Sequence, residues 1–314
     1  MSLDPEIAQL LPALNAGFPR VETMAASHLR HVIRQRVQRP PHPRPVGKVI
    51  DQTVSGPAGD IGVRIHWPAT SSASCDVLPL VVFAHGGGFV FCDVDSHDEL
   101  CRAMTNGLSA VVASVEYRLA PESRWPAAAE DVYTVADWAA RHAEALGGDP
   151  TRLVVAGDSA GGNLAAVTAL LARDRGRPAI AGQVLLYPVI AADFGTASYR
   201  RFGTGYYNTA AAMAWYWDQY APNSVDRSHP YASPLQARLA DLPPAVVVTA
   251  GFDPLCSEGE EYAKALAAES VTTIHRHYAS AIHGFMTMAG LGLCTRARNQ
   301  AWADISVLMS RSSE

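Results

Sequence analysis

Short, fully apolar runs alternate with longer segments of helical spacing along most of this chain, and this alternation limits the fold more than any other feature. We predict buried strands over residues 78–84, 110–115, 153–156, 183–187, 245–250 and 272–278. We predict helices over residues 98–108, 127–141, 161–172, 258–268 and 296–309. Strands that are apolar along their whole length and are separated by helices are typical of a mostly parallel sheet covered on both faces. The sequence therefore predicts an α/β fold.

Three segments fall outside this alternation. Residues 49–54 and 61–67 flank Gly56-Pro-Ala-Gly-Asp60 and predict an antiparallel hairpin. Residues 1–47 hold short amphipathic pieces and end in a proline-rich run that predicts a linker. Residues 190–230 form an aromatic-rich insert without a strand-like run. We therefore expect a core formed by residues 46–189 and 231–314, with residues 1–45 and 190–230 as a helical cap over one end of the sheet.

Charge and cysteine content narrow the classes of function. Lys and Arg number 25 against 30 Asp and Glu, a net charge of −5, so we expect no nucleic-acid partner. The arginines of the first 47 residues then fit a solvated helical face better than a basic arm. The five cysteines lack C-x-x-C spacing, which argues against a disulfide framework and a zinc site. Neither a signal-peptide pattern nor a run of eighteen apolar residues occurs, so we expect a cytoplasmic protein without stable membrane insertion.

The strongest chemical signal is Gly157-Asp-Ser159-Ala-Gly161, between an apolar strand and an Ala/Leu-rich helix. This is the context of a nucleophile elbow, a tight turn that places a serine hydroxyl at the N-terminus of a helix. The bare pattern also occurs as an ordinary glycine turn, and it is the strand-turn-helix context that favours the elbow. Asp158 is a candidate second carboxylate for the chemistry, but a hydrogen bond to neighbouring backbone is the better interpretation.

A second glycine-rich segment, His85-Gly86-Gly87-Gly88-Phe89, directly follows an apolar strand. Glycines leave backbone amides unobstructed, and acyl transfer needs such amides to stabilise the negative charge on the carbonyl oxygen. A phosphate-binding loop is the alternative, but the G-x-G-x-x-G and G-K-[ST] spacings are absent here. We predict the amides of Gly87, Gly88 and Ala160 as the oxyanion donors.

A serine nucleophile needs a base, and the base needs a third group that holds its tautomer. In the expected architecture the acid and then the base follow the serine along the chain. Asp253 lies just past one predicted strand and His283 lies in the loop after the last one. His275 and His277 are the rival bases, but they fall inside the predicted strand 272–278. We therefore predict Ser159, His283 and Asp253 as nucleophile, base and orienting acid.

Five motifs of this chain together resemble the hormone-sensitive-lipase family of α/β-hydrolases, in its bacterial esterase branch. They are His85-Gly-Gly-Gly-Phe89, Tyr117-Arg-Leu-Ala-Pro-Glu122, Gly157-Asp-Ser-Ala-Gly-Gly162, Asp253-Pro-Leu255 and His283-Gly-Phe285. The resemblance covers about residues 45–310. It implies the α/β-hydrolase fold, the same triad and oxyanion hole, a cap, and hydrolysis of short- to medium-chain carboxylic esters without metal or cofactor. Two positions depart from the family pattern: Glu116 stands where an aspartate is usual, and Cys92 where a glycine often follows the oxyanion loop.

We accordingly predict a serine carboxylesterase acting on a small ester. A non-catalytic ligand receptor on the same fold remains as an alternative, although family members of that kind lack the base histidine. An amidase, a deacetylase or a long-chain lipase remains as well, but the insert has no basic amphipathic face of the kind that meets a lipid interface.

Several further residues have expected places around the site. Residues that follow or flank the motifs are expected either to line the substrate pocket or to pack in the core: Phe89, Phe91, Tyr187 and Phe285. Arg118 and Glu122 are predicted to form a buried ion pair beneath the site. Strand 272–278 is expected at a sheet edge, where it could pair with its counterpart in a homodimer.

Overall fold

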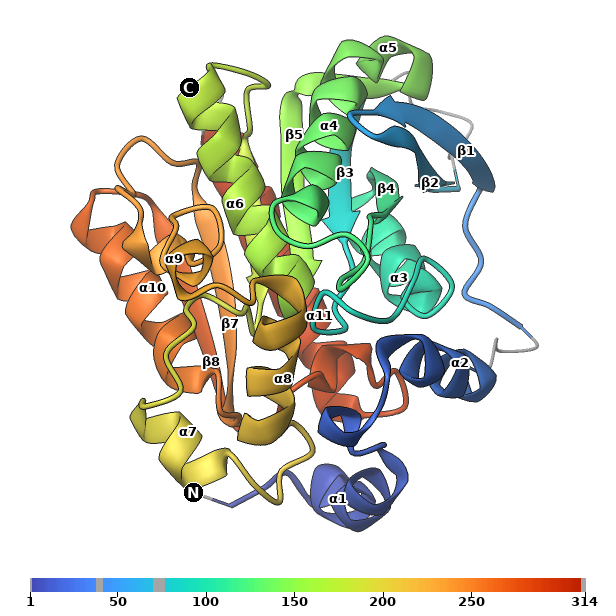
Figure 1. Cartoon of the computed structure of the whole chain (residues 1–314). Helices are drawn as coiled ribbons and strands as arrows, with labels where there is room; N and C mark the ends of the chain where they lie inside the picture. Colours follow the sequence, from blue (N-terminus) through green and yellow to red (C-terminus); the bar gives the residue numbers. More distant parts are fainter. Residues whose placement is uncertain (1, 38–41, 70–76, 312–314) are drawn as a thin grey trace.

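A twisted sheet forms the centre of the protein, with helices on both faces (Figure 1). The computed structural model describes residues 2–37, 42–69 and 77–311. Within these ranges the sheet has eight strands in the order β1-β2-β4-β3-β5-β6-β7-β8. The strands are β1 (Lys48–Gly56), β2 (Gly59–Trp67), β3 (Leu78–Ala84), β4 (Val111–Glu116), β5 (Gly148–Asp158), β6 (Gly182–Leu186), β7 (Ala245–Phe252) and β8 (Thr273–Ile282). The predicted α/β-hydrolase fold class is thereby confirmed.

Strand direction agrees with the sequence pattern. Strands β1 and β2 form the predicted antiparallel hairpin, and β2 also pairs antiparallel with β4. From β4 to β8 every pairing is parallel. The carboxyl ends of these strands therefore meet at one edge of the sheet, where ligands bind in open α/β folds.

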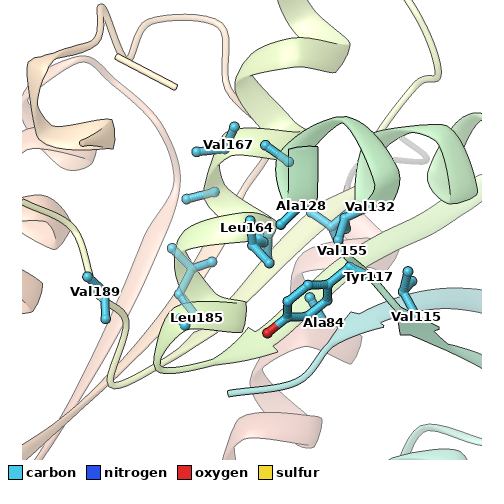
Figure 2. Packing of buried hydrophobic residues seen from close by; sticks show 14 of the residues in the cluster. Ala84, Val115, Tyr117, Ala128, Val132, Val155, Leu164, Val167, Leu185 and Val189 are labelled. Atoms are coloured by element: carbon cyan, nitrogen blue, oxygen red, sulfur yellow. The ribbon is translucent and has the colours of Figure 1, made fainter. Parts of the chain in front are cut away.

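The central strands are apolar on both faces because helices cover both. Leu80, Val82 and Ala84 of β3 pack in one buried cluster with α4 (Ala127–Arg141), α6 (Ala160–Arg175) and α10 (Cys256–Ala268). Figure 2 shows part of this cluster, where side chains of α4 and α6 lie over the strands. Val81 and Phe83 of β3 point the other way, into a cluster with α3 (Asp98–Leu108) and α11 (Gly292–Arg311). Burial of each large aliphatic side chain contributes about 1.5–3 kcal/mol, so both layers hold the strand ends in place.

Strands β5 and β8 extend well beyond their predicted ranges. Strand β5 begins at Gly148, five residues before the predicted start, because Asp149–Arg152 is polar and partly exposed and gives no apolar signal. Strand β8 continues to Ile282 through a register shift after the pair Ala250↔Tyr278. Conversely, β6 ends one residue before the predicted end because Tyr187 adopts a positive φ of 37° and leaves the ladder.

Helices from the N-terminal arm and from the aromatic insert gather at the carboxyl end of the strands (Figure 1). The arm contains α1 (Pro5–Gly17) and α2 (Ala26–Arg36), and the insert contains α7 (Ala197–Phe202), α8 (Ala210–Tyr220) and α9 (Ser224–Arg227). Asn15 ties the two segments together, since its side chain donates to the Gly205 carbonyl at 2.8 Å and accepts from the Tyr207 amide at 2.9 Å. The Phe18 and Tyr207 rings meet edge to face at 5.1 Å. Residues 38–41 of the predicted linker lie outside the described residues.

The predicted ion pair between Arg118 and Glu122 is wrong. Arg118 instead binds Asp131 of α4, with Nη2 to Oδ1 at 2.7 Å, and the Asp131 side chain is fully buried. Glu122 binds Arg30 of the N-terminal arm at 2.5 Å. The reason is geometric: the loop after β4 runs across the start of α4, which brings Asp131 under Arg118 and leaves Glu122 facing the arm.

Strand β8 lies at the edge of the sheet, as expected. None of the helices in the described part of the chain is both long enough and apolar enough to cross a membrane.

Candidate active site

The turn between β5 and α6 carries Ser159 in a conformation that few L-residues adopt. Its φ is 55° and its ψ is −117°, a strained region that persists where the surroundings impose it. The backbone of Ser159 is held on both sides: its amide donates to the Leu186 carbonyl at 2.8 Å, and its carbonyl accepts from the Val189 amide at 3.1 Å. A Cβ on Gly161 would lie 1.9 Å from the Ala84 carbonyl oxygen. The glycine-flanked turn is therefore needed for the elbow to pack against β3.

Pairing between β7 and β8 places Asp253 beside His283. The last pair in the register is Phe252↔Ile282, so the next residue on each strand is one of the two predicted triad members. The register shift after Ala250 creates this match, and such irregularities commonly re-aim side chains next to active sites.

Ser159, His283 and Asp253 form a continuous chain of hydrogen bonds. His283 Nε2 lies 2.9 Å from Ser159 Oγ, and His283 Nδ1 lies 2.7 Å from Asp253 Oδ2. The other Asp253 oxygen, Oδ1, accepts the Leu255 amide at 2.9 Å. Asp253 is fully buried, while Ser159 and His283 each retain 8% exposure. The structure thus brings together the three side chains that the sequence predicted, with the hydroxyl and the imidazole open to a ligand.

The Gly87 and Gly88 loop lies against the same cavity as Ser159. Gly87 has a φ of 106°, and a Cβ there would lie 2.2 Å from the Phe91 carbonyl oxygen. Gly88 has a φ of 58°, and a Cβ there would lie 2.4 Å from Tyr216 Cγ in α8. Both positions therefore require glycine. Ala160, the third predicted donor, is the first residue of α6 and is fully buried.

The Asp158 carboxylate holds the glycine-rich loop of residues 85–89 through a backbone hydrogen bond. Its Oδ1 accepts the Gly86 amide at 2.8 Å and lies 3.2 Å from His97 Nε2. Burial acts to raise the pKa of Asp158, but the interactions with His97, His85 and the Gly86 amide outweigh it and lower this pKa. Burial also lowers the pKa of His85 to about 4. An ionised Asp158 thus fixes the loop by accepting its amide, as the preferred interpretation of the sequence expected.

The cavity at Ser159 has a volume of about 120 Å³, well below the roughly 300–1,000 Å³ of common ligand pockets. Its walls come from the elbow, the glycine-rich loop of residues 85–89 with the residues that follow it, the His283 loop, the N-terminal arm and the aromatic insert. The lining residues are Phe18, Gly87, Gly88, Phe91, Cys92, His97, Asp158, Ser159, Tyr207, Asn208, Met213, Tyr216, His283, Gly284 and Thr287. A larger hollow of about 720 Å³ lies beside β2 and has neither Ser159 nor His283 in its walls.

Of the four predicted pocket residues, Phe91 lines this cavity. The structure places the other three in packing positions, each with at most 1% exposure. Phe89 stacks on Tyr220 at 3.8 Å, and Tyr187 meets the His283 ring edge to face at 5.0 Å. Tyr187 and Phe285 pack against each other at 5.9 Å. Tyr187 therefore supports the imidazole from the side instead of touching a ligand.

The sequence did not predict which residues of the N-terminal arm and of the aromatic insert line the cavity. Phe18 sits after α1, in a segment whose sequence gave only amphipathic spacing, while Tyr207, Met213 and Tyr216 belong to the aromatic insert. The one signal for them was the aromatic content of that insert. Cys92 has a φ of 68°, which explains why a glycine is common at this position in the family that the motifs resemble.

Fold and site together define a class of protein. Residues 81–287 match a family described as alpha/beta hydrolase fold, and the chain belongs to this family. The match spans the glycine-rich loop of residues 85–89, the elbow and the three predicted triad positions.

Individual relatives narrow the class further. The chain is 38% identical over 312 residues to Esterase LipI of Mycobacterium tuberculosis, covering 98% of this chain and 96% of that one. It is 36% identical to Carboxylesterase NlhH of the same species over 293 residues, 91% of this chain and 90% of the relative. The solved structure of a hyperthermophilic esterase from the archaeon Pyrobaculum calidifontis superposes with a TM-score of 0.91 at 40% identity, covering 98% of this chain and all of that one.

Proposed function

We propose that this protein is a serine carboxylesterase that hydrolyses short- to medium-chain esters through an acyl-enzyme. The observation that carries the proposal is the hydrogen-bond chain from Ser159 Oγ through His283 to Asp253, set on a strained elbow beside a glycine loop. The likeness to chains named as esterases supports it.

In the acylation step, His283 Nε2 takes the Ser159 proton as Oγ attacks the ester carbonyl carbon. The amides of Gly87, Gly88 and Ala160 stabilise the resulting oxyanion, in a site that largely excludes water. The tetrahedral intermediate then collapses, and the alcohol leaves with the proton that His283 returns. Water attacks the acyl-enzyme by the same route and restores the free serine.

Asp253 acts by orientation and charge. Its Oδ2 accepts the His283 Nδ1 proton, so Nε2 presents a lone pair to the serine hydroxyl in the resting state. When His283 becomes positively charged, the buried carboxylate stabilises it. Asp253 is itself held by the Leu255 amide, and this fixes the direction of its second oxygen.

The small cavity supports short acyl groups over long ones. Phe91, Met213 and Tyr216 contribute to its walls, and they limit the space beyond the reacting carbon. We expect rates on p-nitrophenyl esters to be highest between about C2 and C6 and to fall steeply by C12. A maximum at C12 or longer, rising above the solubility limit of the ester, would support the lipase alternative instead.

The test of the proposal is hydrolysis of p-nitrophenyl butyrate by the wild type and by Ser159→Ala. Removal of the nucleophile should lower the rate constant by at least about 10³ while the melting temperature stays near that of the wild type. A receptor without catalysis predicts no hydrolysis by the wild type. An amidase predicts faster turnover of the matching anilide than of the ester.

We also infer a homodimer formed through β8, because this strand has a neighbouring strand on one side only and an edge strand can pair with a second copy. Static light scattering at micromolar concentration should then give twice the chain mass, and the monomer mass would contradict this inference. A cytoplasmic location is proposed as well. The free thiols of Cys92, Cys101, Cys256 and Cys294 support it, since reducing compartments keep thiols free; Cys75 lies outside the described residues.

A further inference from the structure

A cluster of three metal-ligating side chains lies outside the active site, between α10 and β8. Cys256 and Glu260 are four residues apart on α10 and share one face of that helix. His277 comes from β8, which forms the edge of the sheet beside α10. One ligand atom from each of the three residues lies within 4.8 Å of the other two.

The separations between these atoms match the edges of a tetrahedral zinc site. Cys256 Sγ lies 3.6 Å from Glu260 Oε1 and 3.8 Å from His277 Nδ1, and His277 Nδ1 lies 3.4 Å from Glu260 Oε1. Ordinary Zn–S, Zn–N and Zn–O bond lengths with tetrahedral angles give edges of about 3.6, 3.6 and 3.4 Å in the same order. A zinc ion therefore fits between the three atoms with little movement of the side chains.

The chemistry of the donors selects the ion. A thiolate and an imidazole favour zinc over magnesium or calcium, which prefer oxygen ligands. One thiolate and one carboxylate together balance the charge of a divalent ion. Three protein ligands leave the fourth position for water, since Glu260 and His277 keep 35% and 31% side-chain exposure.

Thr249 contacts the ring nitrogen of His277 that would bind the ion. Thr249 of β7 pairs with His277 in the sheet register. Its hydroxyl lies 3.1 Å from His277 Nδ1 and 2.8 Å from His275 Nε2. Zinc binding therefore requires the Thr249 hydroxyl to release His277 Nδ1, and this hydroxyl keeps its contact with His275.

We propose that Cys256, Glu260 and His277 form a binding site for one zinc ion per chain, although the cysteine spacing in the sequence argues against a zinc site. On binding, the Zn–S bond forms as the Cys256 S–H bond breaks, and the proton passes to the buffer. The ion then ties the first two turns of α10 to β8. Helix α10 begins three residues after Asp253, and β8 ends one residue before His283. The ion would therefore link α10 and β8, the two elements next to the predicted acid and base.

The experiment titrates the reduced, metal-free full-length protein with Zn²⁺ by calorimetry and with Co²⁺ by absorption. We expect one ion per chain and a thiolate-to-cobalt charge-transfer band. Cys256→Ser should abolish the band, and His277→Gln should weaken binding by at least about 100-fold. His142→Gln, an exposed histidine on another part of the surface, should bind as the wild type does. With Zn²⁺ at about 100 times its Kd, the melting temperature should rise by about 4 °C.

Several results would overturn the site. These are the absence of a thiolate band in the wild type, a band that survives in Cys256→Ser, or a stoichiometry of one ion per two chains. If Cys256→Ser fails to fold, His277→Gln still decides the matter, because His277 is exposed at the sheet edge and its loss leaves no cavity. Undiminished Zn²⁺ affinity in that variant would also contradict the proposal.

Discussion

Replacing Asp253 by asparagine isolates the orienting role of the carboxylate. The structure dictates how the new amide would lie, because the Leu255 amide donates to Oδ1 at 2.9 Å. An asparagine must keep its carbonyl oxygen on that donor, since the reversed amide would set two N–H donors against each other. Its NH₂ group then faces His283 Nδ1, where the carboxylate oxygen now lies at 2.7 Å.

This NH₂ group forces the imidazole into the wrong tautomer. His283 Nδ1 would have to accept, so Nε2 would carry the proton and could not take the one on Ser159. Loss of the correct tautomer in a serine triad costs about 10⁴ in kcat, equivalent to about 5.4 kcal/mol of transition-state stabilisation. We expect Asp253→Asn to lower kcat for p-nitrophenyl butyrate by that factor, with a small change in KM.

The assay needs a fold control and a matched substitution. The melting temperature of Asp253→Asn by circular dichroism should stay close to that of the wild type because the two side chains have nearly the same shape. Asp241→Asn makes the same chemical change on a side chain with 74% exposure and should leave kcat unchanged. Activity of Asp253→Asn within about tenfold of the wild type, in a folded protein, would refute the tautomer argument.

Three other substitutions test separate parts of the structure. Gly88→Ala places a Cβ 2.4 Å from Tyr216 Cγ and should lower kcat by about 10²–10³, because it displaces the predicted oxyanion donors. Gly176→Ala is the matched control: Gly176 has a similar positive φ but open space around it, so this variant should keep full activity. Arg118→Ala removes the guanidinium that pairs with the buried Asp131 carboxylate and leaves it the backbone amide of residue 118 as a donor. This change should cost about 2 kcal/mol, a fall of about 3 °C in melting temperature, whereas Arg238→Ala removes an exposed pair and should cost almost nothing. Burial raises the pKa of Glu258 well above its usual value of 4.5. The protonated Glu258 side chain therefore contributes its full stabilisation of the fold below about pH 4.5, and this stabilisation is lost as the pH rises through the pKa of Glu258 in the folded state. The melting temperature of Glu258→Gln relative to wild type should therefore increase between about pH 5 and pH 8. A constant difference between the two proteins over this range would contradict the assignment.

The sequence predicted the parts of the site that local pattern controls. A strand, a glycine-flanked serine and a helix specify the elbow through three adjacent segments, and the chain order then leaves few choices for the acid and the base. The strand ends were harder to place. Four of the five residues that extend β5 toward its start, Asp149–Arg152, are partly or fully exposed at the sheet margin. The register shift that aligns Asp253 with His283 depends on pairing between strands.

Long-range packing determines the features of the site and its surroundings that the sequence did not predict. Phe18 lines the cavity because Asn15 docks α1 onto residues 205–207 of the insert, a contact across about 190 residues of chain that no local signal encodes. The ligand set of Cys256, Glu260 and His277 is similar, because its members come together only when α10 packs against β8. The partner of Arg118 was mistaken for the same reason: proximity in sequence favoured Glu122, whereas the packing of α4 supplied Asp131.

The most direct test of the proposed chemistry is to find which residue an ester-like inhibitor modifies. A p-nitrophenyl alkylphosphonate should react at a single site in the wild type, release one equivalent of p-nitrophenol and abolish hydrolysis. Peptide mass spectrometry should then find the adduct on Ser159, and Ser159→Ala should remain unmodified. Inactivation accompanied by an adduct on any other residue would contradict the account.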